Sequence, residues 1–592
     1  MSRSPETSPQ NEWTIMFFFA GDNNLSPSMI SQLKAIKDAG FQKNTTVLVR
    51  FDPSEKGART SIFEVNVKRK FIEGIPTTNI GDGKDPFVRN LIEDEFTLKD
   101  PHSAERISEK ERNTLDTAKA DEALESFLSI CRRNHPAKHY ILFLVGHGMI
   151  VGSDAFLPDD HPGSAITLQR LGEILWGFAR DVENDNEGIF ELVGMHSCSM
   201  SSIEVAYQLR GTARYMMSTE GISFVGSWPY RQLLKKIFHY VENTNNVDGS
   251  GSNGDQPRPN QMNDDDVKLL LKKLFFLNLH NSTDFMFAGF SADLSLCNLN
   301  KGTVESFNKP LAALTSALKA ALQVPCGRQL LLLAHWEAQS YWQETYTDLC
   351  DFCHCLSRLC GENSNLCRCA DKSCDTDGTL KERIRNACGD VKKQIDPPVP
   401  LGRDRTRGLS ADEVVELREA FDRFVIFSSH FGPTYQYSHG LSIYFPWSRP
   451  IEDGVDNVIE KYRAYEFTKE LVNGGSRSND NSWLSFLEEY FKRTKRAPRK
   501  RDDVPVVADA VVSEMPQGVS TVAVGSGGGA IFVESLEGND GKPSPTLTGK
   551  TSPADSGGLS CNCGSIKNYP MEFPLPPEDD GTFRRVDQQA IE

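Results

Sequence analysis

Two stretches of the sequence decide the fold: HYILFLVGHG at residues 139–148 and IFELVGMHSC at residues 189–198. Each contains a short, continuous apolar run, which is typical of a strand buried on both faces of a parallel sheet. Such sheets place their chemistry at the carboxyl ends of the strands. Because His147 and Cys198 directly follow these runs, we expect both residues at the same edge of one sheet.

The pair His147 and Cys198 is a candidate nucleophile with its acid–base partner, since the two residues are distant in sequence. Residues 199–211 have the apolar spacing of a helix, so Cys198 is predicted at a helix amino end, where the backbone dipole favours the thiolate. Gly148 has no side chain to cover its N–H, which is predicted to hold an oxyanion together with the N–H of Cys198. Each residue alone fits a buried structural role better, but their paired positions favour a site.

The surrounding chain alternates strands and helices, as in a parallel α/β sheet. Ser26 is predicted to cap the first helix, with Pro27 at its first position and Gly40 after its end. The strands predicted are 15–20, 46–51, 61–67 (antiparallel) and 214–219, and the helices are 26–39 and 116–133. From residue 266 onward helical spacing dominates, and one strand returns at 441–445.

The length of 592 residues exceeds that of one compact domain, and the composition shifts along the chain. Residues 243–266 and the part after about residue 500 are rich in Gly, Ser and Asp, a composition that buries too little to stay ordered. A short β-like patch is predicted at 519–533. The predicted organisation is a tail at 1–11, an α/β core at 12–242, a flexible loop at 243–266, a helical and strand second half at 267–495, and a mostly disordered tail at 496–592.

The overall composition, with 39% hydrophobic and 25% charged residues, is ordinary for a globular protein. The net charge of −16 argues against nucleic-acid binding, and the one basic cluster, at 492–501, is predicted to be a solvated run at a domain boundary. No apolar stretch reaches the length of a membrane span, and residues 1–10 contain no secretory signal. We therefore expect a cytoplasmic protein with no membrane partner, while a wrongly chosen start codon leaves secretion open.

Cysteine is unevenly distributed, because eight of the 14 cysteines lie in an insertion at 350–388. Zinc ligation, disulfides and unpaired buried thiols are equally weighted interpretations of this cluster. The candidate zinc ligands share short, irregular spacings and are Cys350, Cys353, His354, Cys355, Cys367, Cys369 and Cys374.

The chain resembles the clostripain family of cysteine peptidases, which are relatives of caspases, legumain and gingipains. The resemblance covers residues 12–495 in an ordered series of landmarks. They are WTIMFFFAGDNNL at 13–25, GHG at 146–148, CSM at 198–200 with Glu204, STE at 218–220, WPY at 228–230, AQSY at 338–341, TDL at 347–349, DF at 351–352 and SHGLSIYFP at 438–446.

This resemblance implies a caspase–haemoglobinase-like fold, with a mostly parallel sheet flanked by helices and a helical C-terminal half. It also implies a cysteine endopeptidase in which Cys198 attacks the scissile carbonyl and His147 protonates the leaving amine. The backbone at Gly148 and Cys198 would hold the oxyanion, and the partners would be protein or peptide substrates. The chemistry requires no cofactor, although some relatives need calcium, and the resemblance does not indicate an oligomeric state. Because relatives are often self-cleaved in surface loops, residues 243–266 are either a processing site or an inert insertion.

Two departures from the family pattern concern the site. His196 stands where relatives carry an acidic residue, and a packing replacement is favoured over a second titrating group or a ligand. The loop 221–227 has no carboxylate, and Gly226 occupies about the place of the Asp that pairs with basic substrates in relatives. Cleavage after Arg or Lys is therefore disfavoured, unless Glu220 or a residue from elsewhere supplies the negative charge. Glu220, Gly226 and Trp228 are the predicted substrate-binding residues.

These departures support an alternative function, an inactive or weakly active relative that serves as a binding or regulatory module. A metal-dependent scaffold organised by the cysteine cluster is a third interpretation.

Overall fold

The computed structural model describes residues 11–40, 42–54, 60–65, 118–149, 151–152, 155–184, 189–245, 263–281, 290–342, 344–361, 379–396, 411–447, 449–450, 458–473, 482–494, 519–524, 530–534 and 590–591. None of the helices in these ranges is long and apolar enough to cross a bilayer.

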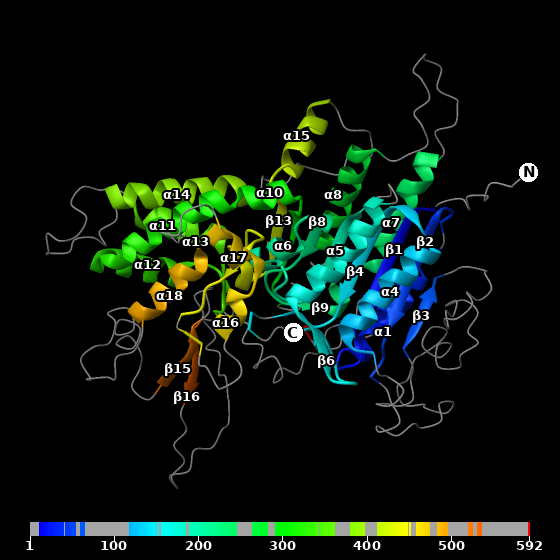
Figure 1. Ribbon diagram of the computed structural model, residues 1–592, viewed down its shortest axis with the longest axis horizontal. Coiled ribbons are helices and arrows are strands. Elements are labelled where there is room, and N and C mark those ends of the chain that lie inside the picture. The colour runs from blue at the N-terminus through cyan, green and yellow to red at the C-terminus, as the bar shows by residue number, and fades with distance from the viewer. Residues whose placement is uncertain are drawn as a thin grey trace, which may run out of the picture.

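An eight-stranded, mostly parallel sheet forms the centre of the structure, in the order β13-β10-β8-β7-β4-β1-β2-β3 (Figure 1). Its five parallel strands are β1 (Asn11–Phe19), β2 (Thr45–Phe51), β4 (Ala137–Val145), β7 (Phe190–His196) and β8 (Ala213–Ser218). The antiparallel strands are β3 (Ser61–Glu64) at one edge, and β10 (Ala292–Asn298) and β13 (Val425–Phe431) at the other.

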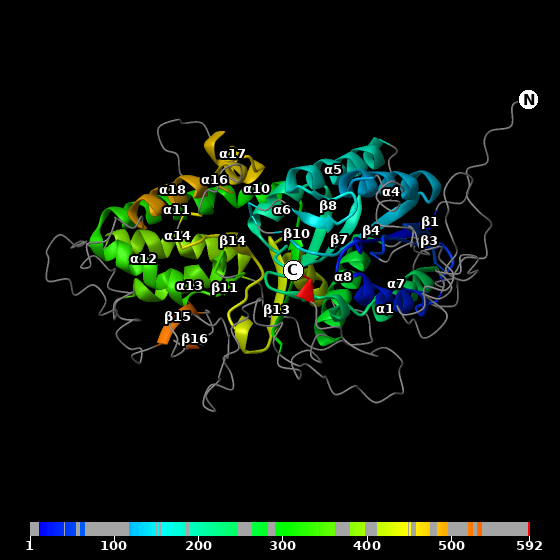
Figure 2. The same ribbon diagram turned by 90° about the horizontal axis from the view of Figure 1, so that it is seen from below.

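Helices cover both faces of this sheet (Figure 2). One face carries α4 (Ala120–Asn134), α5 (Leu168–Asn184) and α6 (Ile203–Leu209), and the other carries α1 (Ser26–Lys37), α7 (Tyr230–Asn245), α8 (Asp264–Asn281) and α15 (Ala411–Phe421). Successive residues of β1 enter different cores, because Met16 and Phe18 face the first set of helices while Ile15 and Phe17 face the second. Burial on both faces explains why the parallel strands are continuously apolar.

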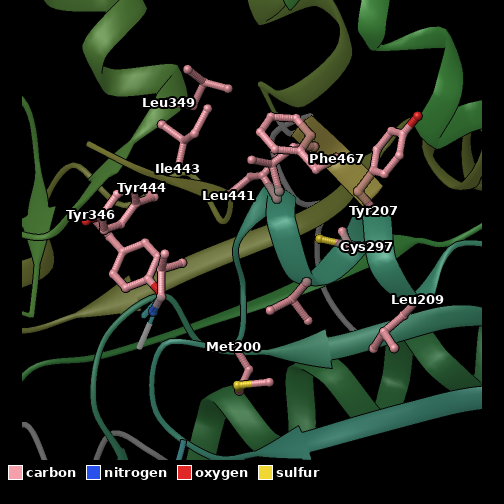
Figure 3. Packing of buried hydrophobic residues seen from close by; sticks show 14 of the residues in the cluster. Met200, Tyr207, Leu209, Cys297, Tyr346, Leu349, Leu441, Ile443, Tyr444 and Phe467 are labelled. Carbon is pink, nitrogen blue, oxygen red and sulfur yellow. The ribbon is translucent and has the colours of Figure 1, made fainter. Parts of the chain in front are cut away.

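The second half of the chain contributes a helical lobe around a three-stranded sheet. The strands are β11 (Ser340–Tyr341), β12 (Tyr346–Asp348) and β14 (Ser442–Tyr444). The helices are α10 (Lys301–Ser306), α11 (Asn308–Gln323), α12 (Pro325–Glu337), α13 (Leu349–Leu359), α14 (Thr379–Ile395), α16 (Val458–Arg463), α17 (Glu466–Asn473) and α18 (Trp483–Thr494). Figure 3 shows that Tyr207 of α6 and Tyr444 of β14 belong to one buried cluster, so the lobe and the main sheet share a core.

Short elements complete the described chain. They are β5 (Phe156–Asp159), β6 (Ser164–Ile166), β9 (Ser223–Phe224), β15 (Val519–Val524), β16 (Ala530–Glu534), β17 (Ala590–Ile591) and the 3₁₀ turns at Val225–Ser227 and Pro433–Tyr435. Strands β15 and β16 pair within the predicted patch at 519–533, and β17 pairs antiparallel with β9.

The predicted fold class is confirmed, and so are the strands and helices that were predicted before residue 242, with two corrections there and two unpredicted strands later in the chain. The helix after the cysteine begins at Ile203, because the Ser202 side chain caps it by accepting a hydrogen bond from the Val205 N–H. Leu25, not Ser26, occupies the cap position of α1, and the Ser26 hydroxyl instead accepts from the Ser54 N–H at 3.1 Å. Strands β10 and β13 were not predicted.

The predicted flexible loop at 243–266 is shorter than expected at both ends, because α7 continues to Asn245 and α8 begins at Asp264. Residues 246–262, 362–378 and 495–518 and most of the chain after residue 534 lie outside the described residues.

Candidate active site

The two segments predicted to carry the site end side by side. Val145, the last residue of β4, is the parallel partner of His196, the last residue of β7. Neighbouring strands lie about 4.8 Å apart, and His147 and Cys198 each follow two residues after the paired position. A side chain at Gly148 would overlap the backbone carbonyl of Cys198, so the two turns are in direct contact. The structure therefore brings His147, Gly148 and Cys198 together at the carboxyl edge of the sheet.

The turn that carries Cys198 is held by backbone hydrogen bonds to the segment before β9. Ser199 has φ +56°, an unusual conformation for a residue with a side chain, and its N–H donates to the carbonyl of Gly221 at 3.0 Å. The Ser201 N–H donates to the carbonyl of Thr219 at 2.8 Å. These contacts fix the turn that carries Cys198 against the loop that follows β8.

The Cys198 thiol lies beneath β9 and is only 1% exposed. The N–H of Ser223 donates to Sγ at 3.3 Å, and Sγ lies 3.7 Å from the Ser223 carbonyl. The prediction that Cys198 sits at a helix amino end was wrong, because α6 begins five residues later. A backbone N–H from β9, not a helix dipole, is thus positioned to stabilise negative charge on the sulfur.

His147 is oriented by a residue that the sequence analysis did not single out. Its Nε2 lies 2.7 Å from Oδ1 of Asn24, which fixes the ring if Nε2–H donates to the amide oxygen. Asn23 shapes the same turn, since its side-chain amide donates to the carbonyls of Ala20 at 2.9 Å and Pro158 at 3.0 Å. Asn24 lies five residues after the end of β1, whereas His147 lies two residues after the end of β4, so comparison of the strand ends did not reveal it.

His196 packs beneath the β9 loop, as favoured from the sequence. Its Nδ1 accepts a hydrogen bond from the Tyr230 hydroxyl at 2.6 Å, and its Nε2–H donates to the Phe224 carbonyl at 2.8 Å. The ring stacks on Trp228, with centroids 4.9 Å apart. Burial lowers the pKa of His196 to about 3, so the imidazole is neutral. Trp228 is itself buried and supports the loop from beneath.

Glu220 is fully buried and bonded toward the helical lobe. Its Oε2 accepts hydrogen bonds from the Ser438 hydroxyl at 2.6 Å, the Gly440 N–H at 2.7 Å and the Tyr341 hydroxyl at 3.2 Å. Burial, and then the charges of Asp348 and Asp293, raise the pKa of Glu220 well above its usual value. This carboxyl links the loop that follows β8 to the helical lobe and does not face the surface.

Asp293 of β10 holds the same loop through its backbone. Its two carboxylate oxygens accept from the N–H groups of Glu220 at 2.6 Å and Gly221 at 3.0 Å. Burial raises the pKa of Asp293 to about 7. Gly226, in the 3₁₀ turn after β9, is partly exposed and supplies no charge.

The landmark segment 438–446 forms hydrogen bonds with the residues that follow Cys198. The Ser201 hydroxyl donates to the Gly440 carbonyl at 2.7 Å, and the Ser442 N–H donates to the Ser201 carbonyl at 3.0 Å. Nearby, Oε1 of Glu204 accepts from the Tyr444 N–H at 3.0 Å. The segment after Cys198 is therefore anchored to residues that lie more than 200 positions later in the chain.

Among the described residues of the cysteine cluster, the structure shows unpaired buried thiols, one of the three interpretations offered by the sequence. Cys350, Cys353, Cys355 and Cys360 are buried free thiols of α13 and its end, and Cys367, Cys369 and Cys374 lie outside the described residues. Cys350, Cys353 and Cys355 do not form a common metal-binding group in the described part of the chain. Cys326 of α12 is disulfide-bonded.

Comparison with known proteins gives a family match over most of the chain. The profile of the clostripain family matches residues 17–489. Among solved structures, an inactive zymogen C11 protease from Parabacteroides distasonis is 16% identical with a TM-score of 0.41, covering 78% of this chain and 98% of that one. A secreted C11 cysteine protease from Bacteroides thetaiotaomicron, bound to an irreversible peptide inhibitor, is 13% identical with a TM-score of 0.38, covering 81% and 99%.

A comparison with curated proteins gives no match. The family profile covers well over half of the 592 residues. The chain therefore belongs to the clostripain family of cysteine peptidases.

Proposed function

We propose that the protein is a cysteine endopeptidase that cleaves peptide bonds through a thioester on Cys198. The Cys198 thiolate attacks the scissile carbonyl, and His147 donates a proton to the leaving amine. The N–H groups of Gly148 and Cys198 stabilise the oxyanion of the tetrahedral intermediate. Water then hydrolyses the thioester, with His147 accepting its proton. These steps use only groups of the chain and its substrate.

The observation that carries this proposal is the strand register at the site. Because Val145 and His196 are paired, the imidazole and the sulfur follow adjacent parallel strands at one edge. The contact between Gly148 and the Cys198 peptide places the two proposed oxyanion donors on touching turns. Asn24 serves as the positioning residue for His147.

Strand β9 is the proposed docking edge for the substrate main chain. It already pairs antiparallel with β17, with Ala590 opposite Phe224 and Ile591 opposite Ser223. An extended peptide taking that edge would run past Ser223, whose N–H contacts Sγ of Cys198.

We also propose that the residue bearing the scissile carbonyl is not basic. The carboxyl groups of Glu220 and Asp293, the ones that contact this loop in the described residues, are buried. Both oxygens of Asp293 and Oε2 of Glu220 accept internal hydrogen bonds, and Oε1 of Glu220 is buried away from the surface. A Lys or Arg side chain would remain unpaired there, which is costly in a desolvated pocket.

The burial of Cys198 favours a second candidate function, an inactive or weakly active relative that acts as a binding or regulatory module. With 1% of the residue exposed, a substrate reaches the sulfur only if the segments that cover it move. An active peptidase would therefore show this movement on binding, whereas a regulatory protein would keep the thiol covered.

Labelling by a peptide-based, thiol-reactive probe, together with cleavage of a peptide library, tests both functions. We expect labelling and cleavage by the wild type, neither by Cys198→Ala, and both by Cys131→Ala, which alters a buried cysteine of α4. The melting temperature of Cys198→Ala should stay near that of the wild type. Turnover retained by Cys198→Ala would refute the site. Absence of labelling and cleavage by a folded wild type would support the regulatory function.

A further inference from the structure

Four side chains that the proposed chemistry does not use converge in the helical lobe. Cys350 and His354 lie one turn apart on α13, Asp396 directly follows α14, and His439 lies in the loop before β14. One ligand atom from each of them lies within 4.8 Å of those of the other three. The group therefore brings together three segments that are distant in the sequence.

The residue types in this group match the preferences of zinc. A thiolate, two imidazoles and a carboxylate form a mixed S, N and O donor set for a borderline-soft divalent ion. Bonds of about 2.0–2.3 Å place neighbouring ligand atoms of a tetrahedral site roughly 3.3–3.8 Å apart. His354 Nε2 and Asp396 Oδ2 are already 3.7 Å apart. The remaining donors need to move by only about an ångström.

His439 has the outer contacts that orient a metal-binding imidazole. Its Nδ1–H donates to the Tyr437 carbonyl at 2.7 Å, and Oδ1 of Asp348 lies 3.5 Å from the same nitrogen. This arrangement assigns Nε2 to an ion, since metal-bound histidines usually donate their other N–H to a carbonyl or carboxylate. The backbone is fixed too, because the His439 N–H donates to Oδ2 of Asp348 at 2.6 Å.

The charges around the group are unbalanced in favour of a cation. Asp348, Asp351 and Asp396 contribute three carboxylates, and Asp348 and Asp351 are buried. Lys392 supplies a fixed positive charge, with its Nζ 3.5 Å from His354 Nδ1. His354 and Asp396 are partly exposed, with side-chain exposures of 41% and 45%, so an ion can enter from solvent.

We propose that Cys350, His354, Asp396 and His439 bind one zinc ion. The Cys350 thiol gives its proton to solvent as the zinc–sulfur bond forms. The ion has a structural role, because it lies in the lobe and not between His147 and Cys198.

The proposed ion is connected to the active-site loop through the neighbours of His439. Ser438 and Gly440 both donate to the buried carboxylate of Glu220. Gly440 also accepts from the hydroxyl of Ser201, three residues after the nucleophile. Zinc bound to His439 would therefore fix the segment 438–440, which forms hydrogen bonds with Glu220 and with the turn that follows Cys198.

Zinc content of the purified full chain tests the proposal, measured by elemental analysis after equilibration with zinc and extensive dialysis. We expect about one zinc per chain for the wild type, and at least a tenfold loss of affinity for Cys350→Ser and His354→Gln. Cys355→Ser is the matched control, since Cys355 lies on the same helix outside the group and should keep the ion. Cobalt should produce a sulfur-to-metal charge-transfer absorption that Cys350→Ser lacks.

Three results would overturn the proposal. The first is a folded wild type that fails to compete with a chromophoric chelator for micromolar zinc. The second is undiminished zinc binding by both Cys350→Ser and His354→Gln, and the third is zinc lost through Cys355→Ser alone. His354→Gln keeps the test valid if Cys350→Ser fails to fold, because the His354 side chain is partly exposed whereas Cys350 is buried. These readouts do not depend on peptidase activity, so failure of the proposed function would leave them interpretable.

Discussion

Replacing His196 with phenylalanine tests how this residue, two positions before Cys198, supports β9. Phenylalanine retains a ring for Trp228 but cannot bond to the Tyr230 hydroxyl or the Phe224 carbonyl. The Phe224 carbonyl still accepts from the Ser227 hydroxyl at 2.7 Å, so the change removes one hydrogen bond there, worth about 0.5–1.5 kcal/mol. The Tyr230 hydroxyl loses its acceptor, which costs about 1–3 kcal/mol. We therefore expect His196→Phe to lower the free energy of unfolding at pH 7.5 by about 1.5–4.5 kcal/mol.

The pH dependence of this effect follows from the neutral state of His196. Its pKa falls from 6.5 to about 3 on burial, so the unfolded chain binds a proton below pH 6.5 while the folded chain does not. The stability associated with neutral His196 is present above pH 6.5 and is lost as the pH falls toward 3. At pH 5 the loss is about 2 kcal/mol. The difference in the free energy of unfolding between the wild type and His196→Phe should therefore be smaller at pH 5 by that amount.

Urea denaturation followed by tryptophan fluorescence at pH 7.5 and pH 5.0 measures both quantities. Asp293 and the other carboxyls with raised pKa respond with the opposite sign, but they are present in both proteins and cancel in the comparison. Tyr230→Phe is the control, because it removes one hydrogen bond while keeping His196, and its pH response should match that of the wild type. An equal gap at the two pH values would refute the idea that burial keeps His196 neutral.

Three further variants test the site and the lobe. Gly148→Ala places a methyl group into the neighbouring nucleophile turn, so kcat/KM should fall by about 10²–10³, whereas Gly177→Ala, whose added methyl meets nothing, should retain activity. Asn24→Ala removes the partner of His147, and kcat should fall at least tenfold with little change in KM; an unchanged kcat would dismiss the positioning role. His335→Phe removes a second buried imidazole, whose pKa burial lowers to about 3. The free energy of unfolding should therefore fall by about 2 kcal/mol less than that of the wild type between pH 7.5 and pH 5, as measured by urea denaturation, and turnover should not change.

The central part of the sheet was predictable because β4 and β7 are covered on both faces and carry few polar side chains. Strand β10 was hidden by its polar residues. Asp293 and Ser295 are buried in it but bond to the backbone of the active-site loop and to the Ser201 hydroxyl. These tertiary contacts replace the apolar pattern by which a buried strand is recognised.

The sequence revealed those site residues that directly follow a predicted strand, because neighbouring parallel strands end at the same edge of the sheet. His147 and Cys198 were found in this way, and His196 was placed under the loop. The start of α6 was missed because the apolar spacing continues back to Met200, while the cap at Ser202 sets the true start. The group around Cys350 was missed because His439 lies 89 positions away, and sequence spacing does not reveal such a meeting.

The central sheet contains strands that precede α7 in the sequence and two strands, β10 and β13, that follow α8. Strand β10 pairs with β8 from Ser295–Ser218 to Asn298–Tyr215, and β13 pairs with β10. A nick anywhere between residues 245 and 264 would cut one covalent link and none of these ladders. We therefore expect the two resulting fragments to co-elute from a sizing column as one particle and to separate only in denaturant.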